Sequence, residues 1–170
     1  MKNKDLGNIK LFAMDVDGTL TDGKIYMGND GEMLKAFNVK DGLGIKLLRD
    51  HGIVPAIITG RTSSIVSNRA KELGMTEVHQ GVKNKAAKLE KLMQQYQITA
   101  DQVAYIGDDM NDLSAIKTAG ITFAPADCAK SLVPYVDIVL SHSSGDAPVR
   151  EAIDLILGVL GINFEGFYDL

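Results

Sequence analysis

Two aspartates lie two positions apart in Asp15-Val16-Asp17-Gly18-Thr19, directly after a short apolar run. In an extended chain, residues two apart point to the same side, so Asp15 and Asp17 bring two carboxylates together at the end of a strand. Close carboxylates repel each other unless one takes up a proton or a cation lies between them. The pair is therefore a candidate for metal-assisted chemistry, although two solvated aspartates in a turn would show the same spacing.

Three kinds of site have acidic or glycine-rich segments of this type. An EF-hand calcium loop would need glycine where Leu20 stands and glutamate where Tyr26 stands. A phosphate-binding Walker A loop would need Ser or Thr in place of Ile25, and a helix after it. In the remaining interpretation, Asp15 attacks a phosphoryl group as a nucleophile, and Asp17 acts first as general acid and then as base.

A second acidic cluster, Asp108-Asp109-Met110-Asn111-Asp112, follows the apolar run at residues 103–106 and Gly107. One aspartate could simply cap the next helix, but capping needs only one of the three. Parallel strands share their carboxyl edge, so this cluster and the first pair can converge on one hard cation. Oxygen ligands of this kind favour Mg²⁺.

Thr59 and Lys85 would complete a site for phosphoryl transfer. Thr59 ends the apolar run at residues 54–58, where its hydroxyl can donate to a phosphoryl oxygen while Gly60 lets the backbone approach closely. Lys85 begins a predicted helix, where the helix N-terminus and the ammonium group both attract an anion. Each residue alone is commonplace, and the order of acidic pair, Thr, Lys and acidic cluster is what indicates the function.

Short apolar runs alternate with helical patterns along the chain, which is typical of an α/β fold with a doubly wound, mostly parallel sheet flanked by helices. We expect strands at residues 10–14, 54–58, 77–79, 103–106, 121–124 and 137–140. We expect helices at residues 41–49, 63–73, 84–96, 110–119 and 146–160. Gly52, Gly74 and Gly120 each follow a predicted helix, where a left-handed C-terminal cap belongs.

One segment, residues 24–37, departs from this alternation. Its two β-like stretches flank the turn-rich tetrapeptide at residues 28–31, which predicts a β-hairpin inserted after the first strand. The chain has no internal repeat and no Pro- or Ser-rich linker, so we expect residues 1–170 to form a single domain.

The composition describes an ordinary acidic globular domain. The 170 residues carry 18 Lys plus Arg against 22 Asp plus Glu, a net charge of −4, and 45% are hydrophobic. These values exclude disorder and fibrous repeats, and the lack of a basic stripe argues against a nucleic-acid partner. The single cysteine, Cys128, indicates a reducing compartment, and no N-terminal run is long enough for a signal or membrane segment. We therefore expect a cytoplasmic protein without a membrane partner.

Together, the four motifs resemble those of the haloacid dehalogenase (HAD) superfamily of phosphohydrolases. In chain order they are Asp15-x-Asp17-Gly18-Thr19, Thr59, Lys85 and Gly107-Asp108-Asp109-x-x-Asp112. Longer strings, such as Phe37-Asn38-Val39-Lys40-Asp41-Gly42, resemble a narrower family, the 3-deoxy-D-manno-octulosonate (KDO) 8-phosphate phosphatases. That family acts in the synthesis of the inner-core sugar of lipopolysaccharide.

The resemblance implies a role for each motif residue. Asp15 would be the nucleophile and Asp17 the acid and base, and Mg²⁺ would be held by Asp15, the Asp17 carbonyl and Asp108. Thr59 and Lys85 would hold the phosphoryl oxygens, while Asp109 and Asp112 would orient the metal ligands and waters without binding the metal themselves. Arg61 and Arg69 would bind the carboxylate or hydroxyls of a phosphorylated sugar acid, Arg69 from an adjacent subunit.

The spacing of the motifs leaves no room for a separate cap domain. Thr59 lies 44 residues after Asp15, a gap that already holds the hairpin and a helix, and Lys85 lies only 26 residues further on. The family closes its capless site by forming homotetramers, in which hairpins associate and a neighbouring subunit covers the pocket. The tail at residues 161–170, with Phe164, Phe167 and Tyr168, could also approach a neighbour's site.

Alternatives exist both for the substrate and for the class of function. The family's glycine-rich segment before the last helix is altered here by Asp146 and Pro148, which bears on the substrate. The closest rival substrate is a nine-carbon sialic or ulosonic acid 9-phosphate. The non-enzyme alternative is a phospho-receiver domain, but there two adjacent acids follow the first strand, whereas the adjacent pair Asp108-Asp109 comes late. A catalytically silent partner of sugar-activating enzymes is a third possibility, which the intact motifs disfavour.

Overall fold

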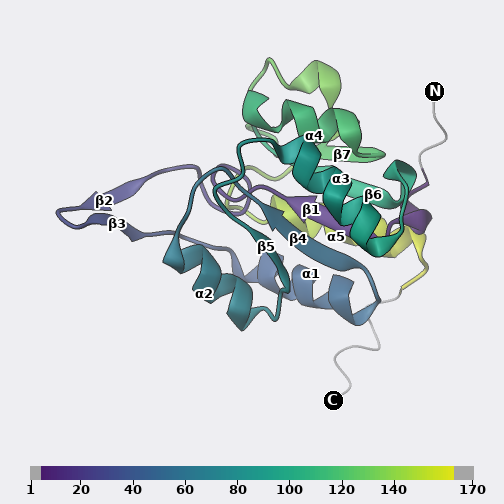
Figure 1. Cartoon of the computed structure of the whole chain (residues 1–170), viewed down its shortest axis with the longest axis horizontal. Coiled ribbons are helices and arrows are strands. Elements are labelled where there is room, and N and C mark those ends of the chain that lie inside the picture. The colour runs from purple at the N-terminus through teal and green to yellow at the C-terminus, as the bar shows by residue number, and fades with distance from the viewer. Residues whose placement is uncertain (1–4, 163–170) are drawn as a thin grey trace.

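The computed structural model describes residues 5–162, which build a six-stranded parallel sheet flanked by helices (Figure 1). The strand order is β5-β4-β1-β6-β7-β8, and each neighbouring pair is parallel. The strands are β1 (Leu11–Met14), β4 (Val54–Ile58), β5 (Glu77–His79), β6 (Val103–Ile106), β7 (Ile121–Ala124) and β8 (Ile138–Val139). The predicted doubly wound α/β fold is therefore confirmed.

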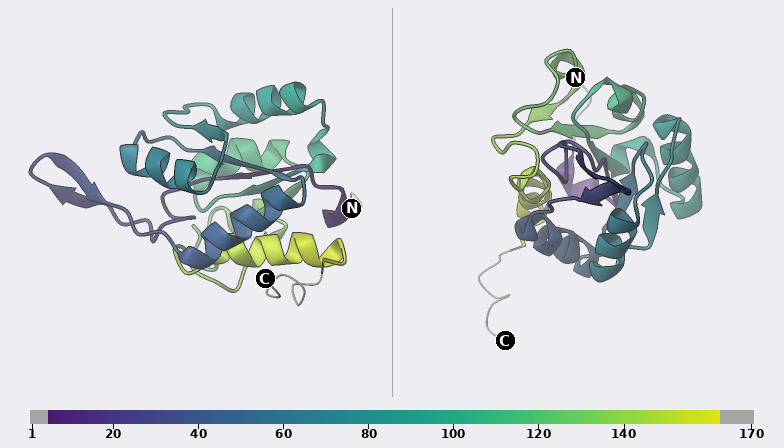
Figure 2. Two further views of the ribbon diagram at one scale, coloured as in Figure 1. Left: turned by 90° about the horizontal axis from the view of Figure 1, so that it is seen from below. Right: turned by 90° about the vertical axis from the view of Figure 1, so that its left-hand side faces the viewer.

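Helices cover both faces of this sheet. One face packs against α1 (Val39–Asp50), α2 (Ser64–Glu72) and α5 (Pro148–Val159), and the other against α3 (Lys85–Tyr96) and α4 (Leu113–Thr118). In β1, Phe12 and Met14 enter the first core, while Leu11 and Ala13 enter the second. Figure 2 shows α1 and α5 side by side beneath the sheet. Strands buried on both sides explain why the sequence shows continuous apolar runs instead of alternation.

A separate two-stranded hairpin follows β1. It pairs β2 (Tyr26–Gly28) with β3 (Gly31–Leu34) antiparallel, and it projects away from the body of the protein (Figures 1 and 2). The turn is shorter than the predicted one at residues 28–31: it comprises only residues 29 and 30, because Gly28 and Gly31 pair with each other, and the register shifts between Tyr26 and Met27. Residues 5–162 contain no cap domain beyond this hairpin.

The remaining elements are short 3-10 turns, at Leu6–Asn8, Ala100–Gln102, Met110–Asp112 and Val133–Tyr135. The third turn replaces the start of the helix predicted at residues 110–119, so that α4 begins only at Leu113. The other helices and the strands of the main sheet end within two residues of the predicted positions.

Two of the three predicted glycine caps are correct. Gly52 and Gly74 adopt left-handed φ values of 76° and 65° after α1 and α2. The prediction for Gly120 is wrong, because this residue is not left-handed. Its role is close approach: a Cβ atom there would lie 2.4 Å from the carbonyl oxygen of Ala100.

No helix in the part of the chain that the structure describes combines the length and apolar character needed to cross a membrane. The proposed tail residues Phe164, Phe167 and Tyr168 lie outside the described residues.

Candidate active site

Three neighbouring strands bring the predicted motifs to one edge of the sheet. Strand β1 lies between β4 and β6, and Met14 is in register with both Ile57 and Ile106. Asp15, Thr59 and Asp108 follow these strands at their carboxyl ends, where α/β sheets bind ligands. The backbone N–H of Asp15 continues the ladder by donating to the carbonyl of Ile106 at 3.1 Å.

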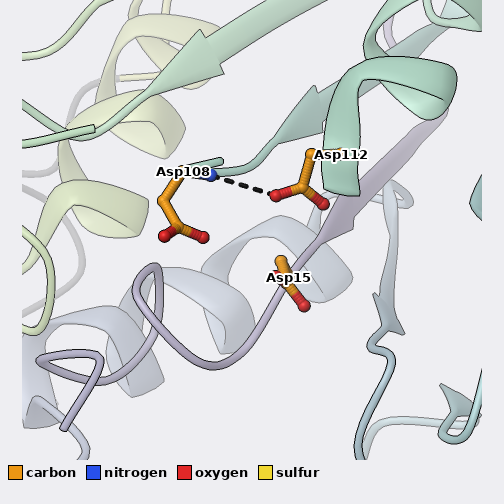
Figure 3. Close-up of side chains that lie close together, drawn as sticks. All are labelled: Asp15, Asp108 and Asp112. Atoms are coloured by element: carbon orange, nitrogen blue, oxygen red, sulfur yellow. Dashed lines mark hydrogen bonds between the residues drawn. The ribbon is translucent and has the colours of Figure 1, made fainter. Parts of the chain in front are cut away.

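Asp15, Asp108 and Asp112 form what we call the acidic cluster (Figure 3). One carboxylate oxygen from each lies within 4.8 Å of the others. Asp15 and Asp112 are buried, and Asp108 is partly buried. The cluster is tied together by the backbone N–H of Asp108, which donates to Asp112 Oδ2 at 3.1 Å.

Lys85 is the buried counter-charge of the acidic cluster. Its Nζ lies 2.6 Å from Asp112 Oδ1 and 3.0 Å from Asp15 Oδ1. Burial alone would lower the pKa of Lys85, but the charges of Asp15 and Asp112 outweigh burial and raise it. The hydroxyl of Tyr105 also donates to Asp112 Oδ1, at 2.6 Å. Asp112 therefore holds Lys85 in place, and one lysine faces three carboxylates.

Burial and the excess of negative charge both raise the pKa values of two aspartates in the cluster. Burial raises the pKa of Asp15 to about 6, and the charge of Asp112 adds to the effect while Lys85 opposes it. Burial likewise raises the pKa of Asp108 to about 7, helped by the charges of Asp112 and Asp15. A divalent cation would relieve the repulsion between these groups. Because the donors are all carboxylate oxygens, the cluster fits a hard ion such as Mg²⁺.

The turn after β1 packs directly against the acidic cluster. Gly18 has a φ of 89°, and a Cβ atom there would lie 2.2 Å from Asp108 Oδ2, so only glycine fits. The loop before α5 braces this turn from outside, because the hydroxyl of Ser144 donates to the carbonyl of Gly18. Gly145 of the same loop also approaches the turn closely: a Cβ atom there would lie 2.7 Å from the backbone nitrogen of Asp22. The altered loop is therefore in contact with the turn that carries Asp17.

The comparisons with known proteins agree with this geometry. A family model described as haloacid dehalogenase-like hydrolase matches residues 43–120. The 3-deoxy-D-manno-octulosonate 8-phosphate phosphatase KdsC of Escherichia coli K12 is 45% identical over 150 residues, which cover 88% of this chain and 80% of that protein. The chain belongs to this family of phosphatases.

Solved structures of KDO 8-phosphate phosphatases have the same fold. The Moraxella catarrhalis enzyme, in complex with a magnesium ion, a phosphate ion and KDO, superposes with a TM-score of 0.90 at 42% identity, covering 95% of this chain and 92% of that one. The cobalt-bound enzyme of Haemophilus influenzae gives a TM-score of 0.91 at 42% identity, with 97% and 95% of the chains covered.

Asp17, the acid and base expected from the phosphatase family, lies beside the acidic cluster but is not a member of it. Its carboxylate accepts a hydrogen bond from Lys35 and lies 3.7 Å from Nε of Arg61. Lys35 also bonds Glu32 at 2.9 Å. Burial would lower the pKa of Lys35, but its hydrogen bonds to Asp17 and Glu32 raise it instead.

The other predicted site residues, Thr59, Asp109 and Arg69, have different surroundings. Thr59 is buried at the end of β4, where its N–H donates to His79 and its carbonyl accepts from Val82. Asp109 is exposed and accepts a hydrogen bond from the N–H of Met110, as a helix cap would. Arg69 lines a pocket between α1 and α2, and its guanidinium pairs with Glu72 at 2.8 Å, not with the acidic cluster.

Sequence reasoning missed three residues at this phosphatase site. Tyr105 could have been found, since it is a polar hydroxyl in an otherwise apolar buried strand two residues before Gly107. Lys35 and Glu32 carry no local signal, because they reach Asp17 only through the fold of the hairpin.

Proposed function

We propose that this protein hydrolyses KDO 8-phosphate to KDO and inorganic phosphate, as an Mg²⁺-dependent phosphomonoesterase. The observation that carries the proposal is the convergence of Asp15, Asp108 and Asp112 on Lys85 at the carboxyl edge of the sheet. The names of relatives that are 45% identical over 88% of the chain support the choice of substrate.

The reaction needs a nucleophile and a proton donor, and Asp15 and Asp17 supply them. Asp15 attacks phosphorus in line, forming an aspartyl phosphate as the bond from phosphorus to the sugar oxygen breaks. Asp17 gives its proton to that sugar oxygen. In the second half, Asp17 takes a proton from the water that attacks the aspartyl phosphate, and Asp15 is regenerated as phosphate leaves.

The remaining polar residues bind the phosphoryl oxygens or the metal ion, or hold those ligands in place. Lys85, at the first turn of α3, and the hydroxyl of Thr59 bind the phosphoryl oxygens. Asp15, Asp108 and the carbonyl of Asp17 would hold Mg²⁺, which when bound reduces the repulsion between an anionic nucleophile and an anionic substrate. Asp112 fixes Lys85 and the backbone of Asp108, and Asp109 orients ligands from the outer side of the site.

We place the sugar acid on the side of Asp17 that faces Arg61. Arg61 is the better supported contact, because its side chain is 45% exposed and lies beside Asp17. Its planar guanidinium suits a carboxylate. Arg69 would act from an adjacent subunit, in keeping with its position away from the acidic cluster of its own chain.

We further propose a homotetramer in which the hairpins associate and a neighbouring subunit covers the site. The hairpin projects from the body (Figure 2) and carries apolar side chains that are largely exposed, with Met27 at 62% and Met33 at 63%. Apolar groups exposed together mark interaction surfaces. Sedimentation equilibrium would test this, and a monomer at micromolar concentration would contradict it. The cytoplasmic location stays a prediction from the lone Cys128.

The substrate assignment is tested by phosphate release from purified protein with Mg²⁺. We expect turnover of KDO 8-phosphate that a chelator abolishes and Mg²⁺ restores, with a higher kcat/KM than for a nine-carbon sialic acid 9-phosphate. Equal or reversed kcat/KM values would refute the eight-carbon substrate. A long-lived aspartyl phosphate without turnover would indicate a phospho-receiver instead of an enzyme.

A further inference from the structure

Lys35 is an ion-paired lysine that the motifs of the active site do not include. It directly follows strand β3, at the base of the hairpin, and its side chain is only 2% exposed. A lysine almost never loses its water unless its charge is paired. Here the partners are two carboxylates, Asp17 and Glu32, which both accept hydrogen bonds from Nζ.

Glu32 anchors this lysine to the body of the protein. The hydroxyl of Ser63, the residue before α2, donates to Glu32 Oε2, and Nη2 of Arg61 lies 3.4 Å from Glu32 Oε1. Both partners belong to the segment between β4 and α2. The ammonium group of Lys35 is therefore fixed with respect to the main sheet, although it comes from the projecting hairpin.

The two carboxylate oxygens of Asp17 have different surroundings. Oδ1 accepts the hydrogen bond from Lys35, whereas Oδ2 lies 3.7 Å from Nε of Arg61, which is beyond hydrogen-bond reach. Lys35 thus holds Oδ1, and Oδ2 stays available to a leaving group. A general acid needs this arrangement, because its proton must be presented within hydrogen-bond distance of the leaving oxygen.

We propose that Lys35, braced by Glu32, is a positioning residue that fixes the carboxyl group of Asp17 for protonation of the leaving sugar oxygen. The proposal rests on the function proposed above. Lys35 stays protonated throughout: the proton moves from Asp17 to the sugar oxygen as the bond to phosphorus breaks and the bond to Asp15 forms. The hairpin therefore contributes to catalysis through the contact between Lys35 and Asp17.

The test compares two leaving groups in Lys35→Met, Lys35→Arg and the control Lys91→Met, which removes an exposed lysine from α3. KDO 8-phosphate has an alkoxide leaving group that must be protonated, whereas p-nitrophenyl phosphate releases a stable aryl oxide without help. We compare kcat/KM values, since these include only the steps up to aspartyl phosphate formation and exclude the later role of Asp17 as a base.

For Lys35→Met we expect kcat/KM for KDO 8-phosphate to fall about 100-fold or more, and for p-nitrophenyl phosphate less than about fivefold, because only the first reaction uses the acid. Lys35→Arg should recover part of the loss, and Lys91→Met should behave as wild type. Glu32→Gln, which keeps the lysine but weakens its anchor, should show the same selectivity with a smaller loss.

Equal losses on both substrates would overturn the proposal, since they would indicate a general structural role or a phosphate contact. A change confined to KM for KDO 8-phosphate would overturn it too, by making Lys35 a substrate contact. If wild type hydrolyses other alkyl phosphates but not KDO 8-phosphate, the substrate assignment fails, and the comparison of alkyl with aryl phosphate still decides the role of Lys35.

Discussion

The acidic cluster and the Lys35 group (Lys35, Asp17 and Glu32) lie at the same edge of the sheet but are held in different ways. Asp15 and Asp112 are buried on elements packed into the core, with Lys85 between them. In the Lys35 group the lysine side chain is only 2% exposed, but Asp17 and Glu32 are 19% and 16% exposed, and the group depends on a hairpin that stands out from the body (Figure 1). The proposed nucleophile and its lysine are thus fixed by elements of the main sheet and core, while the proposed proton donor, Asp17, is fixed by the hairpin.

This difference suggests how an enzyme without a cap domain can adapt to substrates with different leaving groups. The phosphoryl chemistry needs charges at fixed positions, which the parallel strands provide from within the fold. The leaving group varies from substrate to substrate, and here the residue that serves it is positioned from the hairpin.

The largest expected effect is from Asp15→Asn. An amide cannot attack phosphorus, so kcat should fall by at least about 10⁴-fold, as it does when other nucleophiles are removed. The thermal midpoint should not fall, because the variant removes a buried negative charge from an already overcharged cluster. Activity and thermal unfolding are measured on the same preparation. Activity above a trace would exclude Asp15 as the nucleophile and move the centre of the reaction elsewhere.

The acidic cluster should also bind Mg²⁺ in a strongly pH-dependent manner. The pKa values of about 6 for Asp15 and about 7 for Asp108 mean that both groups must lose protons when a cation binds. Between about pH 7.5 and pH 5.5 the affinity should therefore fall roughly 10- to 100-fold. Calorimetric titration in buffers of different ionisation enthalpy would measure the affinity and the protons released. A pH-independent affinity without proton release would contradict these acidities.

A smaller effect is expected from Asp41, a buried carboxyl group outside both regions. Its Oδ1 accepts the N–H of Arg150 at 2.7 Å, its Oδ2 has no hydrogen-bond partner among the described residues, and burial raises its pKa to about 7. Because this folded-state pKa lies above the unfolded value, its contribution to stability is complete below about pH 4 and is lost as the pH rises through about 7.

Asp41→Asn should therefore raise the thermal midpoint at about pH 8 by roughly 2–8 °C and leave it almost unchanged at about pH 4. The comparison is made on metal-free protein, with Asp30→Asn at the exposed hairpin turn as the control. A lower midpoint at pH 8 would show that the ionised Asp41 stabilises the contact between α1 and α5, contrary to the raised pKa.

Most of the fold could be predicted from the sequence, because strands buried on both faces leave unbroken apolar runs such as residues 103–106. Candidate site residues that directly follow a strand, such as Asp15 and Asp108, are equally easy to predict. The misjudged Gly120 shows the limit: a glycine after a helix looks like a cap, and only the fold reveals that it makes room for Ala100. Lys35 could not be found at all, since 18 residues and a hairpin separate it from Asp17.

The most direct test of the central claim is to trap the covalent intermediate. Wild-type protein is mixed with KDO 8-phosphate and Mg²⁺, quenched in acid within the first turnover, and its peptides are analysed by mass spectrometry. We expect one phosphoryl group on Asp15, and none in the absence of Mg²⁺. A phosphoryl group on Asp108 or another residue, or rapid turnover in which no phosphorylated peptide forms, would contradict the proposed mechanism.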